Sequence, residues 1–177
     1  PSLSAEAIAE EWIHGTFRRP WWCSPTRFER SFVEPVREMM LSSREMVVDY
    51  MMPLGLHHLF AADHHYGPEP WCNPPGWRVD WTPPYYHKAD SLGIGFDRTK
   101  DGSGNVTQYP EPLCSLYDSL EGCPENLLLW FHHVPWTHRM ESGNTLWEEM
   151  CLHYEKGCRQ ASDNLKLWQS LKPYVDR

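Results

Sequence analysis

The pattern of hydrophobic and polar positions predicts helices at both ends of the chain. Within residues 4–14, Ile8 and Trp12 lie four positions apart and therefore share one helical face. Ser4 occupies the position of an N-cap, and Gly15 stands where such a helix would end. We therefore expect an amphipathic helix over residues 4–14.

A second helix is predicted to begin at Ser24-Pro25, because a capping residue followed by proline at the first helical position is a common helix start. The apolar residues on one face are Phe28, Phe32, Val36, Met39 and Met40. Pro35 is expected to kink this helix. Ser42 and Glu45 have the spacing of a capping box and predict a separate helix, which Pro53 would end.

The C-terminal third shows two further helical patterns. Thr145 is expected to cap a helix that Gly157 ends, and its apolar face comprises Leu146, Met150 and Tyr154. A last helix is predicted over 158–171, with Pro173 as its stop; its apolar positions are Ala161, Leu165, Trp168 and Leu171. The short apolar run 127–131 fits either a buried strand or one helical segment.

Residues 63–98 follow neither a helical nor a strand period and are rich in aromatic residues and proline. A long irregular segment in a compact domain usually has a function. The whole chain is 14% aromatic, so rings are expected to pack many of its loops. We therefore predict a mainly α fold, an irregular multi-helix domain with long aromatic and proline-rich loops, in which residues 1–177 form a single domain.

Charge and hydropathy exclude several classes of partner. The net charge of −8, from 16 basic and 24 acidic side chains, argues against nucleic acid and against anionic lipid. The chain has no apolar run of about 18 residues, so no membrane insertion is expected. It begins at Pro1 without a methionine or a signal-peptide pattern, which predicts a piece of a longer protein. Its compartment stays open between cytoplasm, periplasm and secretion.

The six cysteines include no C-x-x-C pair, which argues against a structural zinc site. A domain of this length can form a core without disulfides, so we expect reduced and mostly buried thiols. The one pair that we propose for a disulfide is Cys114 with Cys123.

The ten histidines are considered first as metal ligands. Neighbours such as His64-His65 point in different directions, so one metal ion would rarely bind both. The most plausible set combines His57 or His58 with Asp63 and His65. We nevertheless predict no metal and no cofactor. Histidine is expected to act as a planar packing group that hydrogen-bonds loop carbonyls.

Paired carboxylates are the catalytic groups of most glycosidases. The candidates in the irregular segment are Asp63, Glu69, Asp80, Asp90 and Asp97. The sequence does not pair them, and each is expected to have a structural role. Asp63 and Asp97 are as well suited to capping and arginine pairing as to catalysis.

Four long stretches resemble the C-terminal region of glycoside hydrolase family 67 α-glucuronidases. They are SREMVVDYMMPLGLHHLF (43–60), DHHYGPEPW (63–71), YYHKADSLGIGFDRT (85–99) and LLLWFHHVPWTHRMESGNTLWEEMCLHY (127–154). They follow the order of the family, and the opening SAEAIAEEWI is also similar to the start of that region. The resemblance therefore extends over nearly the whole chain.

The resemblance implies a specific parent enzyme, which hydrolyses the α-1,2 bond between (4-O-methyl)glucuronic acid and the terminal xylose of short xylo-oligosaccharides, with inversion. Its acid and base lie in a preceding (β/α)8 barrel, absent from this chain. The C-terminal region is mainly helical, packs on that barrel, and forms most of a homodimer interface. The fragment alone is therefore predicted to be inactive.

The resemblance also implies one substrate contact, because family enzymes use a C-terminal tryptophan as a wall of the uronic acid pocket. By its place in the G-P-x-P-W run, this residue is Trp71. Pro68 and Pro70 would stiffen the loop, and His65 and Tyr66 are expected to support it. The alternative is that Trp71 packs internally.

Two other functions stay open from the sequence. A stand-alone carbohydrate-binding module would present its aromatic loops to successive sugars, because the C–H faces of a pyranose pack on flat rings. A histidine-based metalloenzyme is the other alternative, and metal analysis would test it.

Overall fold

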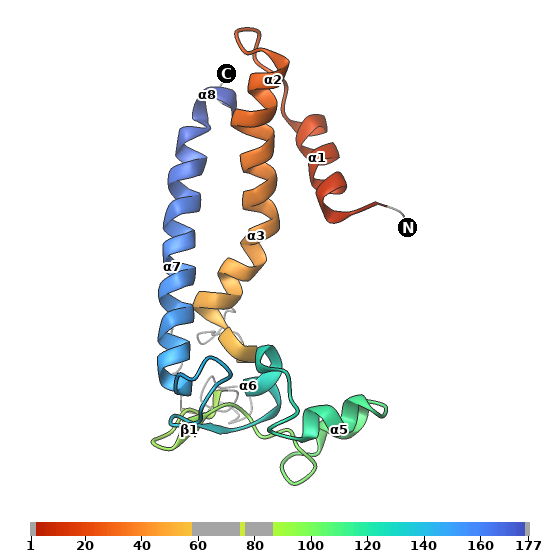
Figure 1. The fold of residues 1–177 in the computed structure, drawn as a ribbon, viewed down its shortest axis with the longest axis vertical. Helices are drawn as coiled ribbons and strands as arrows, with labels where there is room; N and C mark the ends of the chain where they lie inside the picture. Colours follow the sequence, from red (N-terminus) through yellow and green to blue (C-terminus); the bar gives the residue numbers. More distant parts are fainter. Residues whose placement is uncertain (1–2, 58–74, 77–86, 176–177) are drawn as a thin grey trace. The chain divides into compact units, whose positions relative to one another are not determined.

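The computed structural model describes residues 3–57, 75–76 and 87–175. Their ribbon is drawn in Figure 1. The chain divides into two compact units, one formed by Pro1–Asp49 with Glu155–Arg177 and the other by Tyr50–Tyr154. We describe each unit by itself. That residues 1–177 form a single domain stays a prediction.

The first unit is helical. Its elements are α1 (Ala5–Thr16), α2 (Pro25–Phe28), a π-helical turn (Glu29–Val33), most of α3 (Glu34–Met51), the second half of α7 (Leu146–Ser170) and α8 (Lys172–Val175). Within this unit α3 and α7 run side by side in opposite directions (Figure 1). The amide of Asn164 donates to the Met46 sulfur at 3.4 Å, and so joins the two helices.

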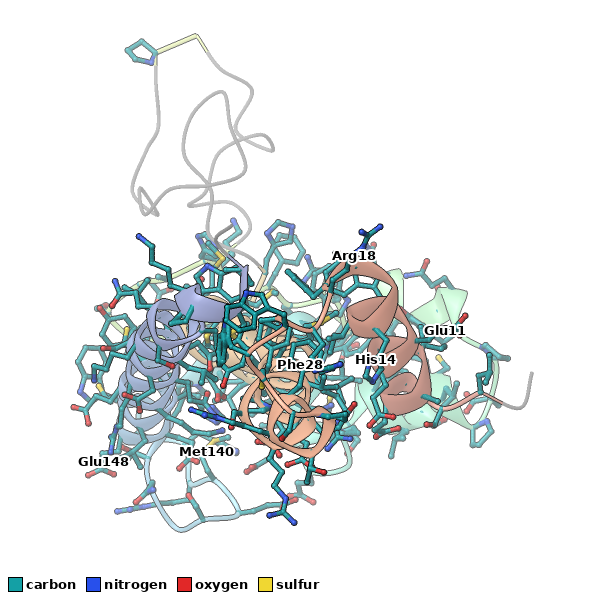
Figure 2. All side chains as sticks on the ribbon, turned by 90° about the horizontal axis from the view of Figure 1, so that it is seen from above. Glu11, His14, Arg18, Phe28, Met140 and Glu148 are labelled. Atoms are coloured by element: carbon teal, nitrogen blue, oxygen red, sulfur yellow. The ribbon has the colours of Figure 1, made fainter. Side chains whose placement is uncertain are left out.

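An aromatic core fills the first unit. Its buried residues are Ile13, Cys23, Phe28, Phe32, Val33, Val36 and Leu171. The rings of Phe28 and Phe32 stack at 5.1 Å, and Tyr174 lies 5.4 Å from Phe32. Figure 2 shows Phe28 among the side chains that crowd beside α3, whereas Glu11 and Arg18 reach outwards. The predicted face of the second helix is therefore the one that is buried.

The predicted helix starts at Ser4 and Ser24 are confirmed. The Ser4 hydroxyl accepts from the Ala7 amide at 3.2 Å, and the Ser24 hydroxyl accepts from the Arg27 amide at 3.3 Å. Helix α1 extends one residue beyond Gly15, to Thr16. The π-helical turn ends two residues before Pro35, which has no N–H for a regular i−4 hydrogen bond, and α3 continues to Met51.

Two predicted helix boundaries are wrong. Ser42 starts no helix; it lies inside α3, where its hydroxyl donates to the Glu38 carbonyl at 2.8 Å. A serine bonded to the preceding turn in this way is compatible with a helix interior. Gly157 does not end a helix, because α7 runs through it for 25 residues. The segment 158–171 is therefore no separate helix, and Pro173 falls in the first turn of α8, where proline is tolerated.

The second unit consists of short elements linked by loops. Among its described residues, the helical elements include the 3₁₀ turns Pro53–Gly55, Asn105–Gln108 and Glu125–Leu127, with α5 (Leu113–Asp118), α6 (Leu128–Phe131) and the start of α7. Strand β1 (Gly93–Ile94) pairs antiparallel with β2 (Val134–Pro135), with Gly93 opposite Pro135. The apolar run 127–131 is therefore helical. The predicted mainly α class is confirmed.

The core of the second unit joins these short elements. Its buried members include Leu54, Val106, Leu129, Val134 and Leu146. The rings of Tyr117 and Phe131 stack at 4.7 Å against this core. The start of α7 in this unit carries the predicted cap, because the Thr145 hydroxyl accepts from the Glu148 amide at 3.3 Å.

Cys114 and Cys123, the one pair considered for a disulfide, form no bridge. Both residues carry free, buried thiols, and Cys23 is also free and buried. Burial raises the pKa of the Cys123 thiol to about 11. Cys151 and Cys158 are free and exposed. Within the described part of the chain, no helix has the length and apolar character to cross a membrane.

Candidate functional site

A column of rings and a guanidinium group crosses the second unit. The ring of His57 stacks on Trp130 at 5.8 Å, with 12° between the ring planes. The Arg98 guanidinium lies 4.2 Å from the centre of the Trp130 ring and 4.8 Å from that of Phe96. Arg98 is only 8% exposed and also donates to the Trp130 carbonyl. We call His57, Trp130, Arg98 and Phe96 the ring column.

His57, a member of the ring column, lies close to His87, which is distant from it in the sequence. The ring centres of His57 and His87 lie 6.4 Å apart, and His87 is 1% exposed. The His87 carbonyl accepts from the Gly95 amide at 2.8 Å, just beyond β1. The residues that flank the segment 58–86 therefore lie close together.

The predicted site residues Trp71, His65 and Tyr66 belong to the segment 58–86 and lie outside the described residues. The same holds for His58 and His64 and for the carboxylate candidates Asp63, Glu69 and Asp80. Their proposed roles stay predictions.

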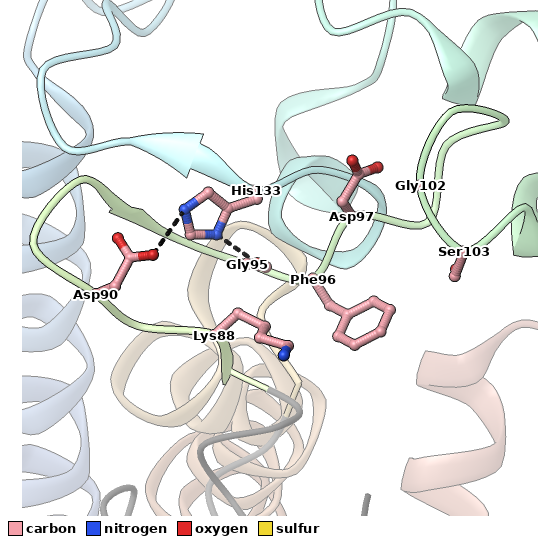
Figure 3. A pocket seen from close by; sticks show the side chains of 8 residues that line it. All are labelled: Lys88, Asp90, Gly95, Phe96, Asp97, Gly102, Ser103 and His133. Carbon is pink, nitrogen blue, oxygen red and sulfur yellow. Dashed lines mark hydrogen bonds and ion pairs between the residues drawn. The ribbon is translucent and has the colours of Figure 1, made fainter.

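A pocket of about 290 Å³ opens beside the ring column (Figure 3). It is lined by Lys88, Asp90, Gly95, Phe96, Asp97, Gly102, Ser103 and His133. The strand pair fixes its two sides, since Gly95 directly follows β1 and His133 directly precedes β2. The amide of Arg98 donates to the Phe131 carbonyl at 2.8 Å and holds the next part of the wall.

Asp90 and His133 form a polar pair at the edge of this pocket. One Asp90 oxygen accepts from the amides of Leu92 and Gly93 at 2.7 and 2.9 Å, and the other lies 3.6 Å from His133 Nε2. The hydrogen bonds from Gly93 and then Leu92 lower the pKa of the Asp90 carboxyl, so it stays ionised. His133 Nδ1 lies 2.9 Å from the Gly95 carbonyl, which fixes its ring.

Asp90 and Asp97 line one pocket but do not have the properties of a glycosidase acid–base pair. In Figure 3 their carboxylates do not point toward each other. Asp97 Oδ1 accepts from the amide and hydroxyl of Thr99, at 3.0 and 2.7 Å, as expected of a turn cap. A general acid needs a raised pKa, whereas the pKa of Asp90 is lowered.

Two of the described histidines confirm the packing role. His132 Nε2 lies 2.9 Å from the Tyr117 carbonyl, and His133 contacts the Gly95 carbonyl. Burial lowers the pKa of His132, which favours its neutral form. Over residues 3–57, 75–76 and 87–175, no group of three or more His, Cys, Asp or Glu side chains could hold a metal ion.

Sequence reasoning missed the ring column and the pocket beside it. Arg98 and Trp130 lie 32 positions apart in the sequence, and neither carries a motif of its own. The one available signal is that both fall within the stretches that resemble the α-glucuronidases, GFDR and LLLWF. That resemblance indicates a region of the chain, but it does not predict which two side chains are in contact.

Comparison with known proteins identifies the class to which this fold and these loops belong. Residues 1–177 match the family described as the glycosyl hydrolase family 67 C-terminus. The chain therefore belongs to this family of C-terminal domains, which confirms the resemblance.

Two of the similar proteins are named as alpha-glucuronidases. Alpha-glucuronidase A of Aspergillus tubingensis is 34% identical over 179 residues, covering 100% of this chain and 20% of that protein. Alpha-glucuronidase A of Emericella nidulans is 34% identical over 182 residues, with the same coverage. The chain thus spans about a fifth of the length of these relatives.

Proposed function

We propose that this chain is the C-terminal domain of a xylan-degrading α-glucuronidase. The observation that carries the proposal is the match of the whole chain to alpha-glucuronidases. The complete enzyme would hydrolyse the α-1,2 bond of (4-O-methyl)glucuronic acid on xylo-oligosaccharides, with inversion. Its catalytic carboxylates would lie in a (β/α)8 barrel outside this chain. The roles of Asp90 and Asp97 as turn caps agree with this division of labour.

We further propose that Trp71 forms one wall of the uronic acid pocket, with His65 and Tyr66 supporting it. The contact between His57 and His87 supports this proposal. His57 and His87 flank the segment 58–86, and their ring centres lie 6.4 Å apart.

The test uses the complete enzyme and an aldouronic acid substrate. Trp71→Ala is expected to lower kcat/KM by about tenfold or more, which corresponds to about 1.4 kcal/mol of lost transition-state stabilisation. Trp21→Ala is the matched control, because Trp21 is 93% exposed and should leave kcat/KM unchanged. An unchanged kcat/KM for Trp71→Ala would remove Trp71 from the site.

The domain is also proposed to pack on the barrel and to contribute a homodimer interface. Large apolar side chains are exposed on two of its helices. They are Ile8 and Trp12 on α1, and Leu152, Leu165 and Trp168 on α7. Exposed apolar residues of this size often mark interaction surfaces. Sedimentation of the complete enzyme with Trp168→Glu and with Trp12→Glu would show which helix supports the dimer.

The chain without its barrel is predicted to be inactive. Incubation of the isolated chain with aldouronic acid should release no glucuronic acid, while the complete enzyme releases it. Turnover by the isolated chain would contradict the proposal, since it would require catalytic groups within residues 1–177.

A stand-alone carbohydrate-binding module is the second candidate. Trp21 and Trp22 favour it, because both are exposed in the loop between α1 and α2. Titration of xylo-oligosaccharides against tryptophan fluorescence distinguishes the two functions. A module should bind longer oligosaccharides more tightly, and Trp21→Ala should abolish the response. A domain that contributes a single wall should bind at most in the millimolar range, about 4 kcal/mol.

A further inference from the structure

Short contacts with the backbone hold the walls of the pocket beside the ring column in place. Gly95 has a φ of +105°, and a Cβ there would lie 2.1 Å from the His132 carbonyl oxygen. A Cβ on Gly102 would lie 2.4 Å from the carboxyl carbon of Asp97. Lys88 is a non-glycine residue with a φ of 47°. The left-handed conformation of Lys88 costs free energy and is found mainly where the surrounding structure, often a binding site, fixes it.

The polar groups of this pocket combine donors with acceptors. Lys88 and Ser103 can donate, and the carboxylates of Asp90 and Asp97 can accept. A sugar hydroxyl both donates and accepts, so a mixed lining suits it. An anion would meet two carboxylates, and the lowered pKa of Asp90 keeps one of them charged. The lining therefore favours a neutral polyol over an anionic ligand.

Phe96 supplies the apolar surface that a pyranose requires. Its side chain is half-buried and lines the pocket, with the Lys88 ammonium 5.9 Å and the Arg98 guanidinium 4.8 Å from its ring centre. The C–H groups of a sugar ring pack on such a surface. The volume of about 290 Å³ lies at the lower end of the usual range for ligand pockets, about 300–1,000 Å³. One sugar ring fits this size better than a chain.

We propose that the pocket formed by Lys88, Phe96, Ser103 and His133 binds one neutral pyranose ring, and that its ligand is an unsubstituted xylose unit. This step rests on the proposed function, which places xylo-oligosaccharides at the enzyme. Phe96 would carry the C–H face of the sugar. His133 and Asp90, already held by Gly95, Leu92 and Gly93, would bond its hydroxyls without further reorganisation.

The test measures binding of methyl β-D-xylopyranoside to the complete enzyme by saturation-transfer NMR titration. Ser103→Tyr places a bulky side chain in the pocket from an exposed turn, and Phe96→Leu removes the ring. Each is expected to weaken binding of the xyloside by about tenfold, the loss of roughly one stacking contact. Gln108→Tyr is the matched control, an exposed position in the nearby 3₁₀ helix that does not line the pocket.

Parallel measurements separate this inference from the proposed function. Unfolding curves confirm that both variants are folded, and glucuronic acid release from aldouronic acid is followed in each. Unchanged xyloside binding in folded Ser103→Tyr and Phe96→Leu overturns the pocket, whatever the rate of release. A titration with D-glucuronate forms the second arm, and selective loss of glucuronate binding overturns the neutral-sugar assignment. A complete parent enzyme that releases no glucuronic acid contradicts the proposed function instead.

Discussion

The ammonium group of Lys156 lies 2.7 Å from the carboxylate of Asp49, a residue that is only 4% exposed. This ion pair joins α3 to α7 within the first unit. Lys156→Met would leave a buried carboxylate without its ammonium partner. Because the lysine itself is largely exposed, we expect a loss of about 1–3 kcal/mol of unfolding free energy, less than the roughly 3–5 kcal/mol for a fully buried pair.

Lys166→Met is the control for this prediction. Lys166 pairs with Asp163 at 3.0 Å on the exposed surface of α7, where both side chains are in solvent. Urea denaturation should show little change for Lys166→Met and a clear decrease for Lys156→Met. Equal midpoints for the two variants would mean that the Asp49 pair adds no stability.

Gly55 is predicted to be irreplaceable because two independent effects act on it. Its φ is +80°, and a Cβ there would lie 2.7 Å from the Leu127 Cα. Gly104 has a similar φ of +75° but no atom within 4 Å of its added Cβ. Gly104→Ala should therefore lower the unfolding free energy only by the cost of placing alanine in the left-handed region, about 1–2 kcal/mol. Gly55→Ala should cost about 1–3 kcal/mol more, from overpacking. Thermal unfolding of the two variants measures the difference.

His132 is predicted to make the protein less stable in mild acid. Burial lowers the pKa of this imidazole in the folded state, so the unfolded chain takes up the proton first, near pH 6.5. Its contribution is therefore complete above that pH and is lost as the pH falls toward the folded-state pKa. His132→Gln should show a smaller decrease in unfolding free energy between pH 7.5 and pH 5.5 than the parent protein. An identical decrease would exclude His132 as the source.

The cysteines are predicted to separate into two reactivity classes. Cys151 and Cys158 are exposed, whereas Cys23, Cys114 and Cys123 are buried, and the raised pKa of Cys123 keeps its thiol protonated. Among the five described cysteines, brief treatment of the native protein with iodoacetamide should label Cys151 and Cys158, and Cys23, Cys114 and Cys123 should react only after denaturation. Peptide mass spectrometry reads out both steps. A Cys114–Cys123 disulfide would instead leave this pair unlabelled after denaturation without reductant.

The predictions that succeeded depend on short-range chemistry. The caps at Ser4, Ser24 and Thr145 could be predicted because a hydroxyl and the amide that it bonds lie within three residues of each other. The same local reasoning failed at Ser42 and Gly157, where the helix continues. A capping residue shows only that a helix can start or end at that position. Helix α7 continues through Gly157 although a glycine in a helix interior costs about 1 kcal/mol, since most helical stability in proteins comes from tertiary packing and not from local propensity.

The sequence by itself determined the family, the mainly α class and the local helix starts, because these depend on residue identities and on spacings of a few positions. Only the tertiary structure brought His57, Arg98 and Trp130 into one column, paired Asp49 with Lys156, and closed a pocket between Lys88 and His133. Each of these relationships joins residues tens of positions apart. Such contacts follow from how the whole chain packs, and no local pattern specifies them.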